Sequence, residues 1–312
     1  MPTVGQVTDL PTSTLGRTGV NVTKLGYGAM ELRGSAPFGM ARQLDDGDVE
    51  RLLNGVLDAG INLIDTSPDY GSSEEHIGRC IAHRRDEYFL ASKCGCAVGD
   101  GAQGGGFREH VFTRDNIRAG VEQSLRRMNT DHLDLVQFHI SPAQSVLEEN
   151  DSVAELEALR DEGKIRFLGM SGTLPHIEDH IAMGVFDAFQ IPYSAVEREH
   201  EDAISAAAAA GAGTIIRGGV ARGLPEPSPQ LPDQYREALQ ARRDRFAAID
   251  ISDLAGDASP MEFMLRFTIS HPDMHTTIVG TSNADHLAAN IAAASKGPLP
   301  ADVYEAARAR FA

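Results

Sequence analysis

Residues 61–71 read INLIDTSPDYG, and the rest of the chain is best interpreted outward from this stretch. Before it, apolar residues in segment 49–57 recur at helical spacing, and Gly60 provides a stop signal for a helix. The short apolar run that follows ends on Asp65, and Tyr70 comes five residues later, after a Ser-Pro turn. A carboxylate at the end of a buried strand, followed by a phenol in the next loop, is typical of the active site of a parallel α/β fold. Two simpler interpretations are that Asp65 caps a helix and that Tyr70 is an ordinary half-buried aromatic residue.

Short apolar runs alternate with helical patterns along the whole chain. The expected strands are Leu25–Met30, Ile61–Ile64, Tyr88–Ser92, Leu133–Phe138, Phe167–Met170, Ala188–Ile191, Thr214–Ile216 and Thr277–Val279. Continuous apolar strands separated by helices indicate a parallel sheet that is covered on both faces. The glycine-rich dinucleotide signature is absent after the first strand, which counts against a Rossmann domain. These features favour a closed (β/α)8 barrel, the TIM barrel of the α/β class, over an open doubly wound sheet.

Two additions to the barrel are expected. Residues Ser13–Leu25 predict an N-terminal β-hairpin whose turn is GRTG, residues 16–19. A long insertion follows the seventh strand, from Arg217 to about Pro260, with a proline-rich part and one helix. We find no sign of a domain boundary or a repeat, so residues 1–312 are predicted to form a single domain, with residues 1–12 as a flexible extension.

The composition excludes several classes of function. The formal charge of −17 makes binding to nucleic acid or to an anionic membrane unfavourable. No segment approaches the length of about 18 apolar residues that a membrane-spanning helix needs. The N-terminal residues have neither a basic nor an apolar region, so we expect no secretory signal. Three cysteines, an odd number, argue against a disulfide framework, and a cytoplasmic location is therefore expected.

Four chemically active residues fall at or just after the ends of the second, third and fourth strands: Asp65, Tyr70, Lys93 and His139. In a barrel these strand ends meet at one mouth. A cation beside a phenol lowers its pKa, so we expect Lys93 to make Tyr70 a better acid, with Asp65 holding Lys93 in place. His139 would donate to a substrate oxygen or relay a proton. Taken singly, Lys93 is more simply explained as a solvated charge and His139 as a core histidine, but four such residues in consecutive units favour a proton-transfer site.

The chain also resembles the aldo-keto reductases along nearly its whole length. The motifs that carry the resemblance are LGRTG, LGYGAM, GINLIDTSPDYG, EYFLASK, LDLVQFH, EGKIRFLGMSG, FQIPYS and IVGTSNADHLAAN. The resemblance implies a (β/α)8 barrel with a catalytic tetrad of Asp65, Tyr70, Lys93 and His139. It further implies reduction of an aldehyde or ketone to an alcohol, with hydride from C4 of a reduced nicotinamide and a proton from Tyr70.

The resemblance also implies a set of cofactor-binding positions. They are Gly28, Ala29, Met30, Asp65, Ser171, Gly172, Gln190, Arg217, Gly218, Gly219, Ala221, Arg222, Gly280, Thr281, Ser282, His286 and Asn290. Ser171 and Gln190 match the residues that hold the nicotinamide carboxamide. Gly172 stands where the family commonly has Asn, and Arg217 stands where it usually has a stacking aromatic residue. A guanidinium plane can stack, but its charge should disfavour the positively charged oxidised ring.

The expected cofactor is NADPH, with NADH possible. In the segment that resembles the adenosine-phosphate clamp, Thr281 and Ser282 can donate to a 2′-phosphate, and Arg222 could supply charge. His286 stands at a position that is often basic or Gln. We expect the loops 94–112 and 140–150 and the insertion after Arg217 to form the walls of a pocket for a small-molecule carbonyl substrate.

No metal site is expected. Cys94 and Cys96 cannot complete a four-ligand zinc site alone, and the strand ends show no clustered His and carboxylate ligands, so a metal-dependent hydrolase is disfavoured. The two cysteines are interpreted as small buried residues, with a redox-sensitive pair as the alternative. The alternative to a reductase is a weakly active NADPH-binding regulatory barrel, because the potassium-channel β subunits also resemble this family.

Overall fold

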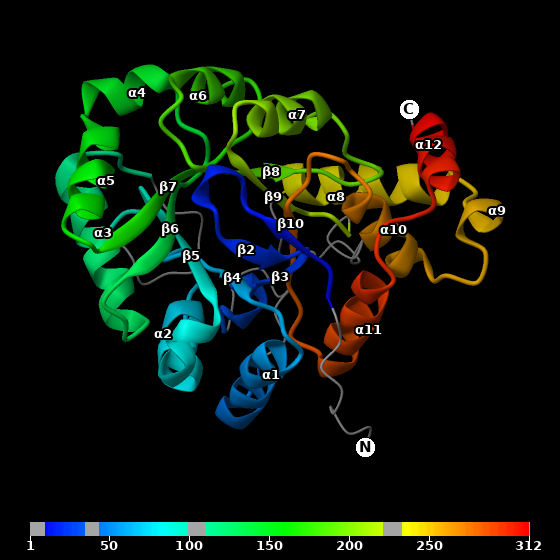
Figure 1. Cartoon of the computed structure of the whole chain (residues 1–312), viewed down its shortest axis with the longest axis horizontal. Helices are drawn as coiled ribbons and strands as arrows, with labels where there is room; N and C mark the ends of the chain where they lie inside the picture. Colours follow the sequence, from blue (N-terminus) through cyan, green and yellow to red (C-terminus); the bar gives the residue numbers. More distant parts are fainter. Residues whose placement is uncertain (1–9, 35–43, 99–109, 221–232, 312) are drawn as a thin grey trace.

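Eight parallel strands form a closed barrel in the computed structural model, which describes residues 10–34, 44–98, 110–220 and 233–311 (Figure 1). The strands are β3 (Leu25–Gly28), β4 (Leu63–Asp65), β5 (Phe89–Cys94), β6 (Leu133–Phe138), β7 (Ile165–Ser171), β8 (Ala188–Pro192), β9 (Gly213–Arg217) and β10 (Thr276–Val279). Each strand pairs with the next in chain order, and β10 closes the barrel against β3. The predicted (β/α)8 barrel is therefore confirmed.

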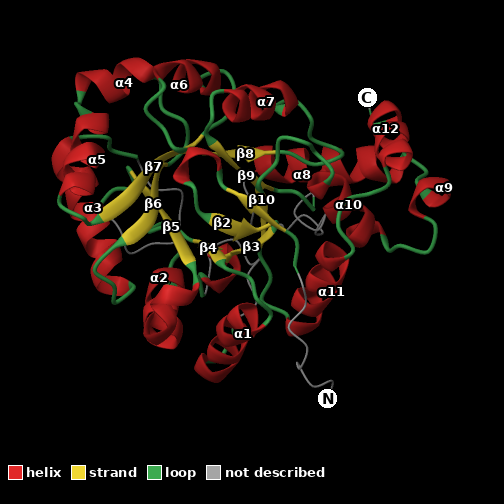
Figure 2. Ribbon diagram, in the orientation of Figure 1, coloured by secondary structure: helices red, strands yellow, loops and turns green. Residues whose placement is uncertain are grey.

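Helices surround this barrel (Figure 2). The α-helices are α1 (Asp46–Asp58), α2 (Ser73–Ile81), α3 (Arg114–Arg127), α4 (Gln144–Glu149), α5 (Ser152–Asp161), α6 (Ile177–Met183), α7 (Glu201–Ala209), α8 (Asp233–Ala247), α9 (Ser252–Ala255), α10 (Pro260–Ile269), α11 (Ala284–Ser295) and α12 (Ala301–Arg310). Short 3-10 helices are η1 (Gly16–Thr18), η2 (Ala29–Leu32) and η3 (Ala82–Glu87). Among the helices of the described ranges, none is both long and apolar enough to cross a membrane.

Helix α1 and the turn after it position the strand that ends on Asp65. Its carboxylate cap Asp45 accepts a hydrogen bond from the backbone N–H of Asp48, which satisfies a free donor of the first turn. The five apolar residues that recur between Val49 and Leu57 are all buried, as the spacing predicts. Gly60 then adopts a left-handed conformation with φ 85°, and the chain turns back into β4, which ends on Asp65.

The predicted hairpin lies over the centre of the barrel in Figure 1, with strands β1 (Thr12–Thr14) and β2 (Asn21–Thr23). Its Leu15 is fully buried and belongs to the cluster that fills the barrel interior, with side chains from β4, β5, β6, β8 and β9. The hairpin therefore closes the amino-terminal end of the barrel, so the carboxyl end is the one available for an active site. The predicted flexible extension 1–12 is wrong for its last residues, because Leu10 is buried and Thr12 begins β1; residues 1–9 lie outside the described ranges.

Several predicted boundaries differ from the structure. The described part of the insertion after Arg217 contains two helices rather than one, α8 and α9, and its proline-rich part lies outside the described residues. The segment 140–150 was expected to be a loop but contains α4. Strand β3 ends at Gly28, and the next residues form η2. The two helices that the sequence did not predict, α4 and α9, have fewer than two turns each, which is too short to show a helical period.

We expect Leu15→Ala to destabilise the barrel. The substitution empties a site at the centre of the interior cluster, where Leu15 is 0% exposed, so the free energy of unfolding should fall by about 2–5 kcal/mol. Urea denaturation followed by circular dichroism measures this change. Met261→Ala is the control, because Met261 is 38% exposed on α10 and its loss should change stability by no more than about 0.5 kcal/mol. Equal losses in the two variants would show that the hairpin does not stabilise the barrel.

Candidate active site

The structure brings the four predicted catalytic residues to the carboxyl end of the barrel. Asp65 ends β4, Lys93 lies near the end of β5, and His139 directly follows β6. Lys93 Nζ lies 2.6 Å from Asp65 Oδ1 and 5.9 Å from the centre of the Tyr70 ring. The rings of Tyr70 and His139 meet edge to face, with their centres 6.3 Å apart. The barrel thus assembles an acid, a phenol, an ammonium group and an imidazole in one site.

Asp65 is the centre of a buried hydrogen-bond network. Its Oδ1 atom accepts hydrogen bonds from Lys93 Nζ at 2.6 Å, from Gln137 Nε2 at 2.9 Å and from Gln190 Nε2 at 2.8 Å. Lys93 Nζ also donates to the carbonyl oxygen of Thr66 at 3.0 Å. The side chains of Asp65 and Lys93 are 2% and 0% exposed, so their charges are compensated by each other and by these amides rather than by water.

Gln137 was not identified by sequence analysis. It is the polar residue near the end of LDLVQF, in register with Lys93 on the neighbouring strand. A glutamine between the apolar residues Val136 and Phe138 was the available signal, because a buried amide needs a polar partner. Its amide nitrogen donates to Asp65, so Gln137 helps to fix the carboxylate that pairs with Lys93.

The acidity of Tyr70 differs from the sequence-based expectation. Burial raises the pKa of Tyr70 above its ordinary value, and the negative charge of Asp65 raises it further. The opposing cation is Arg217, at the end of β9, whereas the charge of Lys93 is taken up by its ion pair with Asp65. The expected lowering of the Tyr70 pKa is therefore wrong for this structure, in which the net shift is upward. Tyr70 is a phenol at neutral pH and can serve as a proton donor.

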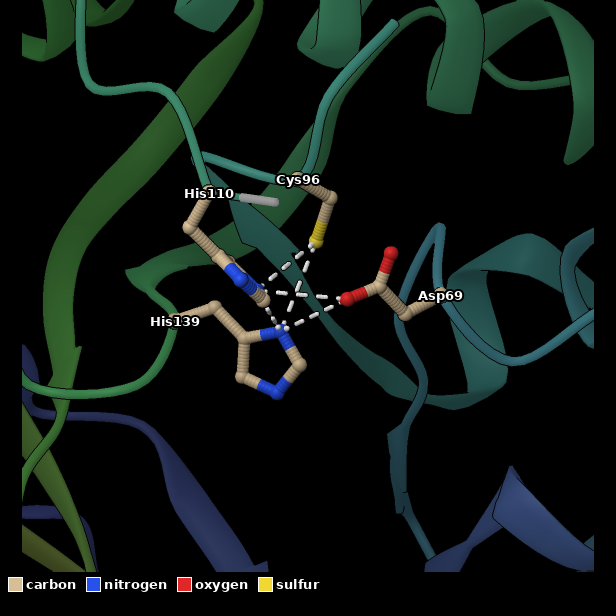
Figure 3. Close-up of side chains that lie close together, drawn as sticks. All are labelled: Asp69, Cys96, His110 and His139. Atoms are coloured by element: carbon tan, nitrogen blue, oxygen red, sulfur yellow. Dashed lines mark hydrogen bonds and ion pairs between the residues drawn. The ribbon is translucent and has the colours of Figure 1, made fainter. Parts of the chain in front are cut away.

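His139 lies in a cluster of three further polar side chains (Figure 3). Its Nδ1 atom is 3.1 Å from His110 Nε2, 3.4 Å from Asp69 Oδ2 and 3.4 Å from Cys96 Sγ. Burial lowers the pKa of His139, although the hydrogen bond with Asp69 opposes that effect. Burial alone would raise the pKa of Asp69. Hydrogen bonds from His110 and His139 outweigh this effect and hold the pKa of Asp69 well below its usual range. His139 is therefore a neutral imidazole next to a carboxylate.

The residues predicted to hold the nicotinamide lie on neighbouring strands. Ser171 of β7 and Gln190 of β8 are directly paired, and the N–H of Gly172 donates to the carbonyl of Gln190 at 3.0 Å. A Cβ atom at Gly172 would lie 3.0 Å from the side chain of Ile177, so the larger residue that the family commonly has there would require Ile177 to move. The amide nitrogen of Gln190 already donates to Asp65, which leaves its oxygen for a ligand.

Backbone segments at the ends of β3 and β10 approach each other closely. A Cβ atom at Gly280 would lie 2.5 Å from the carbonyl oxygen of Gly28, so only glycine fits there. The phenol of Tyr27 donates to the carbonyl of Thr281 at 2.8 Å and fixes the following loop. Ser282 and Asn290 are half-buried and His286 is exposed, whereas Ala221 and Arg222 lie outside the described residues. Hydroxyl, amide and guanidinium donors at one barrel end fit the carboxamide and phosphates of a nicotinamide dinucleotide.

Comparisons with known proteins agree with this geometry. The model of the Aldo/keto reductase family matches residues 24–309 of the chain. The chain belongs to this family. An oxidoreductase of Bacillus subtilis (strain 168) is 26% identical over 307 residues, which cover 94% of each protein. An NADH-specific methylglyoxal reductase of Escherichia coli (strain K12) is 30% identical over 60% of each protein. The holo form of an aldo-keto reductase from Bacillus halodurans superposes with a TM-score of 0.79 at 25% identity, over 97% of this chain and 96% of that one.

The family resemblance seen in the sequence is therefore confirmed. The chain is an aldo-keto reductase, an NAD(P)H-dependent oxidoreductase built on a (β/α)8 barrel. The polar strand ends converge at the carboxyl end of the barrel, the end that such barrels use for chemistry.

The loop after β5 in this aldo-keto reductase depends on one glycine. Gly95 has φ 89°, and the space a Cβ would take is filled by the ring of Phe112. Its neighbours Cys94 and Cys96 are 1% and 2% exposed, and burial raises the pKa of both thiols above the ordinary range. Thiols that remain protonated react slowly with oxidants, which argues against the redox-sensitive pair considered as an alternative.

The turn after His139 is strained. Ile140 and Ser141 adopt left-handed conformations with φ 65° and 54°, which β-branched Ile140 disfavours. The turn is held because Ser141 Oγ donates to the carbonyl of Thr173 at 3.2 Å and accepts from its N–H at 3.1 Å. The Ile140 side chain is 56% exposed, so the turn presents an apolar surface beside His139.

We expect Asp65→Asn to destabilise this aldo-keto reductase strongly. The substitution leaves the buried Lys93 ammonium without its counter-charge, which should lower the free energy of unfolding by about 3–5 kcal/mol. Denaturant unfolding of Asp65→Asn, Lys93→Met and the double variant measures this effect. The double variant should be closer to wild type than Asp65→Asn, because it contains no unpaired charge.

The control for this experiment is an exposed ion pair. Arg79 and Asp46 lie 2.7 Å apart with side chains 46% and 77% exposed, so Asp46→Asn should cost less than about 1 kcal/mol. Strictly additive losses for Asp65→Asn and Lys93→Met would show that the two buried charges do not depend on each other.

Proposed function

We propose that the enzyme reduces an aldehyde or ketone to an alcohol, with Tyr70 as the proton donor. The observation that carries the proposal is the position of the Tyr70 phenol between the buried Lys93–Asp65 pair and the imidazole of His139. A reduced nicotinamide bound at this end of the barrel supplies the hydride to the carbonyl carbon. Ser171 and Gln190 orient its carboxamide, and Thr281 and Ser282 hold its adenosine end.

Tyr70 completes the reduction by giving its proton to the carbonyl oxygen as negative charge develops there. The raised pKa keeps the proton on Tyr70 until that moment, so the phenol hydrogen-bonds to the substrate in the ground state. The charge of Arg217 stabilises the phenolate that remains after transfer. His139, a neutral imidazole whose Nδ1–H donates to Asp69, takes up a proton from solvent and relays it to Tyr70, which restores the phenol.

We infer that the cofactor is NADPH. The hydroxyl groups of Thr281 and Ser282 precede α11, whose amino-terminal dipole favours an anion such as the 2′-phosphate. Asp285 in the first turn of α11 opposes this, because its carboxylate repels a phosphate. NADH is therefore the alternative, and it is the cofactor named for the relative from Escherichia coli.

The mouth of the site supports a small carbonyl substrate. Exposed Ile140 offers an apolar contact next to His139, and Met30, 39% exposed after β3, is a predicted cofactor neighbour. We propose aldehydes and α-dicarbonyls as the first classes to test, since the Escherichia coli relative is named as a methylglyoxal reductase. Quinones and keto-sugars complete the panel.

Arg217→Tyr should strengthen binding of the oxidised cofactor relative to the reduced cofactor. The guanidinium of Arg217 acts on the site as a cation, since it opposes the raised pKa of Tyr70, and it should repel the positive oxidised ring. The expected change in the ratio of the two dissociation constants is about tenfold, equivalent to about 1.4 kcal/mol. Titration calorimetry with NADP⁺ and NADPH measures it. Arg126→Tyr, at an exposed position of α3, is the control, and an unchanged ratio in Arg217→Tyr would contradict the argument.

Tyr70→Phe should lower kcat by about 10²- to 10⁴-fold, because it removes the general acid and leaves the ring in place. Stopped-flow mixing with the substrate panel, first with NADPH and then with NADH, measures turnover and cofactor preference. Tyr88→Phe is the matched control, because Tyr88 is buried before β5, at the opposite end of that strand from Lys93. Tight cofactor binding without turnover in the wild type would instead indicate a regulatory barrel, and equal rates in the two variants would exclude Tyr70 as the acid.

A further inference from the structure

We propose that Asp69, Cys96, His110 and His139 form a binding site for one divalent transition-metal ion of the zinc class. The four ligand atoms lie within 4.8 Å of one another, and Figure 3 shows their side chains pointing at a common centre. The residues come from three different loops, which follow β4, β5 and β6. The sequence-based expectation that the strand ends bring no His and carboxylate ligands together is therefore wrong for the described residues.

Five of the six distances between the ligand atoms are close to the edges of a tetrahedron around zinc, and the sixth, between Cys96 and Asp69, is at most 4.8 Å. Typical Zn–N, Zn–O and Zn–S bonds give edges of about 3.3–3.4 Å between nitrogen or oxygen ligands and about 3.6 Å from nitrogen to sulfur. His110 Nε2 lies 3.1 Å from His139 Nδ1, and Asp69 Oδ2 lies 3.2 Å and 3.4 Å from these two nitrogens. Cys96 Sγ lies 3.4 Å from His139 Nδ1 and 3.9 Å from His110 Nε2. Small side-chain movements would place all four atoms on one ion.

The chemistry of the donors selects the class of metal. A thiolate, two imidazoles and a carboxylate suit zinc or cobalt, whereas magnesium and calcium prefer oxygen ligands alone. On binding the ion, Cys96 would release its thiol proton to solvent, and the resulting thiolate and the carboxylate of Asp69 together would supply two negative charges, which a divalent cation neutralises.

The ligands are held by a structured backbone. Cys96 and His110 face each other in an isolated antiparallel bridge, and the N–H of Val111 donates to the carbonyl of Gly95 at 2.7 Å. Asn116 of α3 ties both sides of this bridge together, since its Nδ2 donates to the carbonyls of Cys96 at 3.1 Å and Val111 at 2.7 Å. The Cys96 Sγ atom also lies 3.7 Å from Ser67 Oγ. Binding therefore requires little ordering of the chain.

A metal at this site would act on catalysis through His139, a consequence that rests on the proposed reductase function. The metal would take the Nδ1 atom of His139, and the Nε2 atom points away from the cluster (Figure 3). Coordination therefore leaves an N–H at Nε2 but removes the second nitrogen needed to relay a proton. We expect zinc to slow turnover reversibly and a chelator to restore it.

Cobalt(II) is the probe for the site, because a tetrahedral thiolate complex of cobalt absorbs in a way that zinc does not. Chelator-treated full-length protein should bind one Co²⁺ per chain, with a thiolate-to-cobalt charge-transfer band and strong visible bands. Cys96→Ser and His110→Ala should lose the charge-transfer band or weaken binding by at least about tenfold in equilibrium dialysis. Cys80→Ser and His83→Ala, outside the cluster, should bind as the wild type does.

Retained NADPH binding in Cys96→Ser and His110→Ala will show that these variants are folded. Absence of the band in the wild type, or an equal band in Cys96→Ser, would overturn the metal site whatever the turnover measurements show. Zinc inhibition that persists unchanged in both ligand variants would place the inhibitory metal elsewhere and would also contradict the proposal. The spectroscopic measurement needs neither cofactor nor substrate, so a failure of the proposed reductase function would leave its result intact.

Discussion

The ion pair between Lys93 and Asp65 is the interaction on which the rest of the site depends. Two charges that are 0% and 2% exposed persist only because each compensates the other and because amides of Gln137 and Gln190 complete the shell of Asp65. The network joins β4, β5, β6 and β8, so it fixes the strand ends that carry the catalytic groups relative to one another. This network therefore fixes the positions of the buried side chains of the active site before any ligand binds.

That pairing also decides how Tyr70 can act. Because Lys93 is engaged by Asp65, burial dominates and raises the pKa of Tyr70, with Arg217 as the opposing cation. A phenol that holds its proton suits a reductase, in which the proton moves only when hydride transfer creates an alkoxide. In the proposed function, the charge of Arg217 disfavours an oxidised nicotinamide, so the same residue would help the phenolate and favour the reductive direction.

Much of this architecture can be predicted from the sequence, since each strand and most helices are local patterns. The four candidate catalytic residues follow from their places at strand ends or in the loop after one, and the family motifs predict the cofactor positions. Gln137, Asp69 and His110 were not predicted, because their roles arise from contacts 14 to 72 residues away along the chain. The direction of the Tyr70 pKa shift was not predicted for a similar reason, since it depends on burial and on the ion pair of Lys93 with Asp65.

His139 links the two parts of the site. Its Nδ1 atom faces Asp69, Cys96 and His110, while its Nε2 atom lies on the opposite side of the ring (Figure 3). Whatever occupies Nδ1 therefore determines whether Nε2 is a donor or an acceptor toward the substrate. A carboxylate that accepts from Nδ1–H makes Nε2 an acceptor, whereas a metal at Nδ1 makes Nε2 a donor. The state of the cluster formed by Asp69, Cys96 and His110 therefore determines which hydrogen bond His139 Nε2 can make toward the substrate.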